Sequence, residues 1–333
     1  MEDRLLFVIS PPRAGSTLLQ RMLGSHSQVY THPEPHLITP LAYLGFHDLV
    51  DKAPYDHINA AEAIRTFVAN LPEQETDYLD ALRAYSDTLY GRMLAPSGRR
   101  YFLDKTPAYA LVLPFLRKLY PNAHYVVLTR HPMAVMSSYA NSFFGGDWDQ
   151  ALAFNPIIQR YVPAIARFLA DPPVHLHHIR YETLVSEPQS ELRRLFQFLQ
   201  LDDEPDAVNY GERFEAKAGM GDPITVHTQG RPVDDSVDKW VAELNASPQK
   251  LQRAREIIAE LDAGDVHLWG FELERLIEQV APDSAGRTFA KPRLNRYIFQ
   301  RRVMLALKKD IRKRPHGRVL ERIRYYCNVL LRE

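Results

Sequence analysis

The sequence predicts an α/β fold: a P-loop-like parallel sheet flanked by helices, with a helical insertion and a basic helical C-terminal tail. Short segments at residues 5–9, 124–129 and 175–180 indicate strands, and the first two are apolar enough to be buried on both faces. Stretches with helical spacing lie between them. Strands that alternate with helices in this way indicate parallel pairing through helical crossovers, with helices on both faces of the sheet.

The turn after the first strand carries the strongest chemical signal. It reads SPPRAGST, residues 10–17, and leads into a helix with an apolar stripe at residues 18–23. A strand, a tight turn and a helix N-terminus in this order direct backbone N–H groups at one point, which favours an anion such as phosphate. The turn lacks the lysine of the motif GxxxxGK[ST], and Ser10 replaces its first glycine. Arg13 supplies a planar cationic fork instead, suited to phosphate or sulfate oxygens. The alternative is an ordinary strand-to-helix turn with Ser16 as N-cap.

The remaining elements follow in chain order. Residues 31–41, THPEPHLITPL, are broken by prolines and are predicted to form a loop close to the first turn. Helical spacing over residues 60–93, interrupted at Pro72, predicts the helical insertion, and a short strand follows at 101–104. Further helices are expected at 108–120, 132–139, 150–169 and 188–199, and again from about residues 236, 248 and 271. Residues 204–234 are expected to form a long loop, and loops of this length often act as lids.

The polar loops of this chain share one position in the predicted fold. Residues 10–17, 104–107, 129–138 and 181–182 each follow a predicted strand. In parallel sheets ligands bind at the carboxyl ends of the strands, so these loops are expected to meet around one site.

The composition is that of an ordinary globular protein, with 45% hydrophobic and 25% charged residues in a chain of 333. A single cysteine, Cys327, excludes an intramolecular disulfide and is compatible with a reducing compartment. The N-terminus does not resemble a signal peptide, and no run has the length of a membrane span. These observations predict a cytoplasmic protein.

Charge is unevenly distributed along the chain. Residues 288–333 hold 14 Lys and Arg against 3 Asp and Glu, a net charge of +11. Because the whole chain has 41 of each kind, the rest carries 27 basic against 38 acidic residues, a net charge of −11. We therefore predict a domain at residues 1–286 and a basic helical extension at residues 287–333. The extension could pack on the acidic body or on a second subunit, as in a homodimer. It could instead recruit an anionic membrane surface or an acidic carrier protein, and no nucleic-acid partner is expected.

Two motifs together resemble the sulfotransferases that use 3′-phosphoadenosine 5′-phosphosulfate (PAPS). PPRAGSTLLQRML is similar to the family's 5′-phosphosulfate loop, and RHPMAVMSSY is similar to its 3′-phosphate element. The resemblance is closest to bacterial and tyrosylprotein-type members and covers residues 5–200, with a weaker return near Lys239 and Trp240. It implies that PAPS is the donor and adenosine 3′,5′-bisphosphate the product, and that no metal is required. The residues that the resemblance assigns to the donor are Arg13, Ala14, Gly15, Ser16, Thr17, Arg130, Ser138, Thr225 and Arg231.

The same resemblance implies catalytic roles for two further residues. Glu34, within HPEPH, matches the general base of the tyrosylprotein enzymes, with His36 and His32 as rival bases because histidine titrates near neutrality. Lys105, within DKTP, matches the lysine that neutralises the leaving phosphate. The alternative for Lys105 is a surface ion pair with Asp104. For the pair Tyr181–Glu182 a structural role is predicted in preference to contact with adenine.

The predicted reaction is therefore in-line transfer of a sulfuryl group from PAPS to an acceptor hydroxyl. Such a transfer resembles phosphoryl transfer, in which positioning and charge stabilisation do most of the work. The acceptor is expected to be a glycan, a glycolipid or a small natural product; a carrier-bound hydroxyacyl group or a protein tyrosine is the alternative. The rival class is a P-loop kinase or NTPase, which requires a Walker lysine and a magnesium carboxylate. Only Asp104 is a candidate for that carboxylate. A non-catalytic binding module on the same fold is the third possibility.

Overall fold

The computed structural model describes residues 1–50, 57–214 and 229–281, together with Val319 and Ile323. The predictions for Thr225, for the centre of the loop at 204–234 and, except for Val319 and Ile323, for the basic extension lie outside the described residues. Residues 1–50, 57–214 and 229–281 belong to one compact unit.

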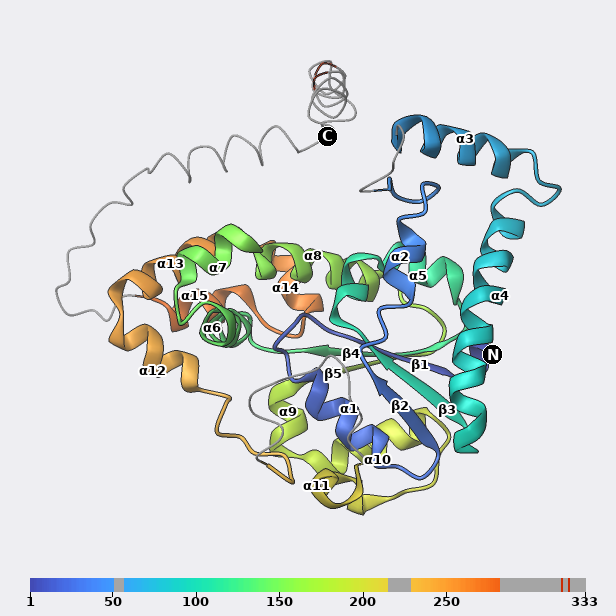
Figure 1. Cartoon of the computed structure of the whole chain (residues 1–333). Coiled ribbons are helices and arrows are strands. Elements are labelled where there is room, and N and C mark those ends of the chain that lie inside the picture. The colour runs from blue at the N-terminus through green and yellow to red at the C-terminus, as the bar shows by residue number, and fades with distance from the viewer. Residues whose placement is uncertain (51–56, 215–228, 282–318, 320–322, 324–333) are drawn as a thin grey trace. The chain divides into compact units, whose positions relative to one another are not determined.

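Five parallel strands form one sheet in the order β2–β3–β1–β4–β5 (Figure 1). Each pair of neighbours runs parallel, which confirms the predicted α/β class. β1 is central: its Leu6 pairs with Leu103 on one side and with His124 on the other. The strands are β1 (Leu5–Ile9), β2 (Val29–Pro33), β3 (Tyr101–Lys105), β4 (His124–Thr129) and β5 (Leu176–Arg180).

Side chains of β1 alternate between two hydrophobic cores, as the pleat of a strand requires. Leu5, Phe7 and Ile9 belong to one core, and Leu6 and Val8 to the other. The first core is covered by α2 (Ile38–Ala42), α4 (Glu75–Leu94), α5 (Leu113–Leu119), α6 (Pro132–Phe143), α7 (Trp148–Phe154), α8 (Ile157–Ala170), α12 (Lys239–Ala246), α13 (Pro248–Ala259), α14 (Ala263–Leu268) and α15 (Leu273–Gln279). The second core is covered by α1 (Ser16–Gly24), α9 (Tyr181–Ser186), α10 (Pro188–Phe198) and α11 (Tyr210–Arg213).

The connections of the two neighbouring strands β1 and β4 place the site. β1 leads into α1 on one face of the sheet, whereas β4 leads into α6 on the other face (Figure 1). When two adjacent parallel strands send their helices to opposite faces, a crevice opens between their carboxyl ends. The two motifs that follow these strands therefore face the same crevice.

The prediction of a continuous loop at residues 31–41 is wrong. β2 occupies its first part and α2 its last part. β2 is an edge strand that pairs only with β3, and an edge strand tolerates Pro33 because a proline has no N–H for a second ladder. Glu34 consequently follows the end of a strand and lies at the same edge of the sheet as the other predicted site residues.

Two further helical predictions need correction. The helix expected at 150–169 is two helices, α7 and α8, which are separated around Pro156 because a proline and the residue before it disfavour a continuous helix. The helix expected at 108–120 begins as a 3₁₀ turn, Pro107–Leu111, and continues as α5. The insertion between β2 and β3 consists of α3 (His57–Ala69) and α4, with the predicted interruption near Pro72. None of the helices in the described ranges is long and apolar enough to cross a membrane.

Candidate active site

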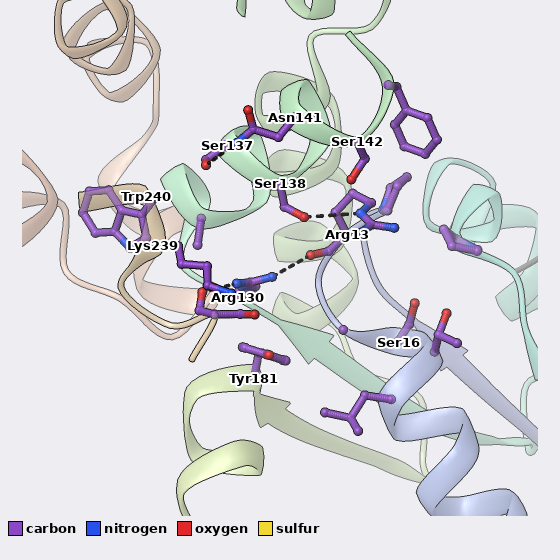
Figure 2. A pocket seen from close by; sticks show the side chains of 18 of the residues that line it. Arg13, Ser16, Arg130, Ser137, Ser138, Asn141, Ser142, Tyr181, Lys239 and Trp240 are labelled. Carbon is purple, nitrogen blue, oxygen red and sulfur yellow. Dashed lines mark hydrogen bonds between the residues drawn. The ribbon is translucent and has the colours of Figure 1, made fainter. Parts of the chain in front are cut away.

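A cavity of about 700 Å³ is lined by residues that follow all five strands of the sheet (Figure 2). The turn after β1, the residues after β2 and β3, the helix after β4 and the start of α9 after β5 all contribute to its wall. The start of α12 completes it with Lys239 and Trp240. The predicted meeting of the polar loops at one site is thus observed.

Gly15 determines the shape of the first turn. It adopts φ 95°, a left-handed conformation that favours glycine, and acts as the N-cap of α1. A Cβ atom at this position would lie 2.4 Å from Cδ2 of Tyr181, so the turn can approach α9 only with glycine here. Ser16 is the first residue of α1, and the alternative that made it the N-cap is wrong. Gly15, Ser16 and Thr17 line the cavity, which places the N-terminus of α1 at its wall.

Arg130 extends from the end of β4 and is held on three sides. Its two terminal nitrogens donate hydrogen bonds to the carbonyl oxygens of Arg13 (3.1 Å) and Ser236 (2.6 Å), and its guanidinium lies 4.3 Å from the ring centroid of Tyr181. Only 6% of the residue is exposed, and burial lowers the pKa of its guanidinium. Its buried Nε–H has no hydrogen-bond partner within the described ranges. A buried donor without a partner is costly, so this group fits an anion in the cavity.

The two predicted anion-binding elements are in direct contact. Arg13 Nε donates a hydrogen bond to Ser138 Oγ at 3.3 Å (Figure 2), while the Arg13 carbonyl accepts the bond from Arg130. Arg13, Arg130 and Ser138 all line the cavity. Ala14 is fully buried behind the turn, and Arg231 is exposed and does not line the cavity.

Glu34 and Lys105 form an ion pair with each other. Lys105 Nζ donates to Glu34 Oε1 at 2.5 Å and lies 3.4 Å from Thr17 Oγ1 in the first turn. The Lys105 side chain is 1% exposed and that of Glu34 is 16% exposed. His36 Nε2 lies 3.7 Å from Glu34 Oε2, so the rival base is a direct neighbour of the glutamate.

Asp104 occupies the opposite face of β3. Its carboxylate accepts hydrogen bonds from the hydroxyl groups of Tyr90 (2.6 Å), Thr106 (2.9 Å) and Tyr109 (3.0 Å), and the residue is fully buried. Burial raises the pKa of Asp104, although these three donors and Lys105 oppose the rise. Asp104 therefore stabilises the core and does not line the cavity, and the alternative of a surface ion pair between Lys105 and Asp104 is wrong.

Several lining residues were not assigned to the site from the sequence. Tyr181 was given a structural role, yet its ring both packs on Arg130 and lines the cavity. Its position directly after β5 was the available signal. Ser137 lies within the motif at residues 130–139, and Lys239 and Trp240 lie where the resemblance returns weakly, but no site role was derived for them; Asn141 on α6 had no local motif that marked it.

His131 links the end of β4 to the C-terminal helices. Its ring stacks on Trp240, with centroids 4.2 Å apart and planes 14° apart. Nδ1 accepts a hydrogen bond from the Met133 N–H, so Nε2 carries the proton and donates to Gln279 Oε1 at 2.9 Å. Burial lowers the pKa of His131 to about 4, and the ring is neutral at pH 7. The residue supports the cavity wall through its contact with Trp240.

The fold and the site define a P-loop-like α/β protein whose cavity is built for anionic groups, with arginine in place of the Walker lysine. The chain belongs to the sulfotransferase family, whose model matches residues 6–205. It is 28% identical over 210 residues to nodulation protein NoeE of Sinorhizobium fredii, covering 57% of this chain and 48% of that protein. It is 25% identical to protein-tyrosine sulfotransferase 1 of Danio rerio, covering 77% of this chain and 70% of that protein.

Solved structures agree on the fold. The sulfotransferase domain from the curacin biosynthetic pathway superimposes with a TM-score of 0.51 at 23% identity, over 83% of this chain and 96% of that domain. The sulfotransferase domain of the Synechococcus olefin synthase gives the same TM-score at 22% identity, over 80% of this chain and 93% of that domain. The chain spans about half the length of the nodulation protein and 30% of an Aquifex aeolicus protein that it also matches.

Proposed function

We propose that this protein transfers a sulfuryl group from PAPS to the hydroxyl group of an acceptor. The observation that carries the proposal is the buried Nε–H of Arg130, which has no hydrogen-bond partner among the described residues, beside the Arg13–Ser138 contact in the cavity that also receives the N-terminus of α1. A donor with a 5′-phosphosulfate and a 3′-phosphate needs two anion sites. The turn at Gly15–Thr17 suits the first, and Arg130 with Ser138 suits the second.

Glu34 is the proposed general base. It would take the proton of the acceptor hydroxyl as the acceptor oxygen bonds to sulfur and the bond from sulfur to the phosphate oxygen breaks. Lys105 touches both Glu34 and Thr17, so it connects the base to the turn that holds the leaving phosphate. When Glu34 becomes protonated, Lys105 loses its anionic partner and its charge becomes available to the leaving phosphate. His36 is the alternative base because it lies next to Glu34.

The acceptor is proposed to be a glycan, a glycolipid or a small natural product. Pro107 and Ala108, which follow Lys105 by two and three residues, line the cavity together with the exposed ring of Phe143. These uncharged groups favour a neutral hydroxyl-bearing acceptor over an acidic one. The relation to a protein-tyrosine sulfotransferase supports protein tyrosine as the alternative.

Donor binding tests the proposed class. Calorimetry with adenosine 3′,5′-bisphosphate in EDTA should show saturable binding, because arginine and lysine supply the positive charge. Binding of ATP that required magnesium, with none of the bisphosphate, would instead establish the kinase class. Transfer from labelled donor to an oligosaccharide, a hydroxyacyl thioester and a tyrosine peptide, assayed in parallel, then identifies the acceptor class.

A cytoplasmic location and a role for the basic extension are further parts of the proposal, and both rest on the sequence. The net charges of +11 and −11 lead us to expect that residues 288–333 pack against the acidic domain or a second subunit. Deleting these residues should then lower the melting temperature or dissociate an oligomer. A deletion variant that stayed stable and active but no longer bound anionic vesicles or an acidic carrier protein would assign the extension to recruitment.

A further inference from the structure

A half-buried carboxylate joins α12 to three other helices, of which α6 lines the cavity. Glu243 lies on α12, one turn after Trp240, and its side chain is 15% exposed. Its Oε2 accepts hydrogen bonds from Ser137 Oγ and from Asn141 Nδ2 (3.0 Å), both on α6. Its Oε1 accepts from Trp148 Nε1 (3.3 Å) on α7 and from Lys250 Nζ on α13.

These four donors leave Glu243 fully engaged. Burial by itself would raise its pKa, but Lys250, Ser137 and Asn141 outweigh that effect and hold the pKa below its ordinary value. The carboxylate is therefore ionised at neutral pH and directed at three helices at once. Apolar side chains would hold helices together at least as strongly as a buried ion pair does. What hydrogen bonds to a carboxylate add is a defined orientation of the helix that carries it.

The orientation of α12 matters because its first turn forms part of the cavity. Lys239 and Trp240 line the cavity on the side of Arg130 (Figure 2), and the Trp240 ring stacks on His131, which directly follows Arg130. A shift of α12 would move a cationic side chain and an aromatic wall together, relative to the arginine that is proposed to bind the 3′-phosphate.

We propose that Glu243 is a positioning residue: through its bonds to α6, α7 and α13 it fixes α12 so that Lys239 and Trp240 complete the donor side of the cavity. The inference rests on the proposed function, since it assumes that the nucleotide occupies this side. It assigns to Glu243 no contact with the ligand.

The test measures the affinity of adenosine 3′,5′-bisphosphate by calorimetry, well below the melting temperature of each variant. Glu243→Gln keeps the shape but removes the charge and turns one acceptor into a donor that faces other donors. It should weaken binding about 3- to 30-fold. The control is Glu256→Gln on α13, which removes the same charge from a pair with Arg253 within one helix, away from the cavity, and should leave the affinity unchanged. If Glu243→Gln fails to fold, Lys250→Met removes only one of the four donors and should give a smaller loss in the same direction.

A double-mutant cycle separates positioning from general destabilisation. If Glu243 acts through Lys239, then Lys239→Ala combined with Glu243→Gln should lose little more affinity than the weaker-binding single variant. Additive losses, or an unchanged affinity in Glu243→Gln, would overturn the inference. Absence of binding in the wild-type protein would instead refute the proposed function, so the two failures are distinguishable.

Discussion

Replacement of Arg130 by alanine should selectively weaken recognition of a 3′-phosphate. A guanidinium carries five N–H donors, and Arg130 uses one of them on Arg13 and one on Ser236, so the contacts among the described residues leave Nε–H and two others for a ligand. A hydrogen bond to a charged group contributes about 1.5–3 kcal/mol, and each 1.4 kcal/mol is about tenfold in affinity. Arg130→Ala should therefore weaken the binding of adenosine 3′,5′-bisphosphate by about 10- to 150-fold, even if only one such hydrogen bond is lost.

The assay compares two ligands so that effects on folding cancel. Calorimetry with adenosine 5′-phosphate, which lacks the 3′-phosphate, should show a change of less than about threefold in the same variant. Arg180→Ala is the matched control: Arg180 also donates to a backbone carbonyl, at 3.2 Å, and lies 5.5 Å from an aromatic ring centroid, but it does not line the cavity. Equal losses of affinity for the two ligands in Arg130→Ala would show that the arginine supports the fold and does not bind the 3′-phosphate.

Three further predictions follow from the same geometry. Glu34→Gln should lower kcat about 10²- to 10⁴-fold with nearly unchanged donor affinity, and an active Glu34→Gln beside an inactive His36→Ala would transfer the role of base to the histidine. Gly15→Ala should destabilise the protein and weaken donor binding because its Cβ would meet the Tyr181 ring. Gly98→Ala is the control: it has φ 65° but no atom within 4 Å of the new Cβ, so it should cost only the backbone strain of about 1–3 kcal/mol. Similar urea midpoints and donor affinities for the two variants would contradict this reasoning. Burial lowers the pKa of His131 to about 4 in the folded state, against an ordinary value of 6.5, so the unfolded chain binds the proton first as the pH drops. The free energy of unfolding should therefore fall between about pH 6.5 and pH 4, by up to about 3 kcal/mol for this group. Measured by urea unfolding, His131→Gln should lose less stability than wild type between pH 7 and pH 5, and an equal loss of stability would exclude this histidine as the cause.

Much of the fold could be predicted from the sequence because its signals are local. The short, continuous apolar runs at β1 and β4 indicate strands that are buried on both faces. Because helices lie between these strands in the chain, the strands are expected to pair in parallel. The turn at residues 10–17 was identifiable because its proline, glycine and hydroxyl residues all fall within eight consecutive positions. The order of these local elements also placed Arg13, Lys105 and Arg130 at the carboxyl ends of the strands, where the structure has them: Arg13 and Arg130 line the cavity, and Lys105 ends β3 in contact with Thr17 and Glu34.

β2 escaped prediction because its proline and its polar residues are typical of a loop, and only pairing with β3 makes the segment a strand. The pairing of Glu34 with Lys105 depends on that register, in which Pro33 is opposite Lys105 although 72 positions separate the two residues in the chain. Spacing along the chain carries no information about such a contact.

The sequence by itself determined the class of fold, the phosphate-type turn and the residues that can carry charge. Tertiary structure alone decided which side chains are in contact: Arg13 with Ser138, Arg130 with Tyr181, and Glu243 with the donors on three helices. The physical reason is that local structure follows from propensity and hydrophobic period, which act over a few residues. Hydrogen bonds between side chains more than 100 positions apart exist only after two cores have packed against opposite faces of the same sheet.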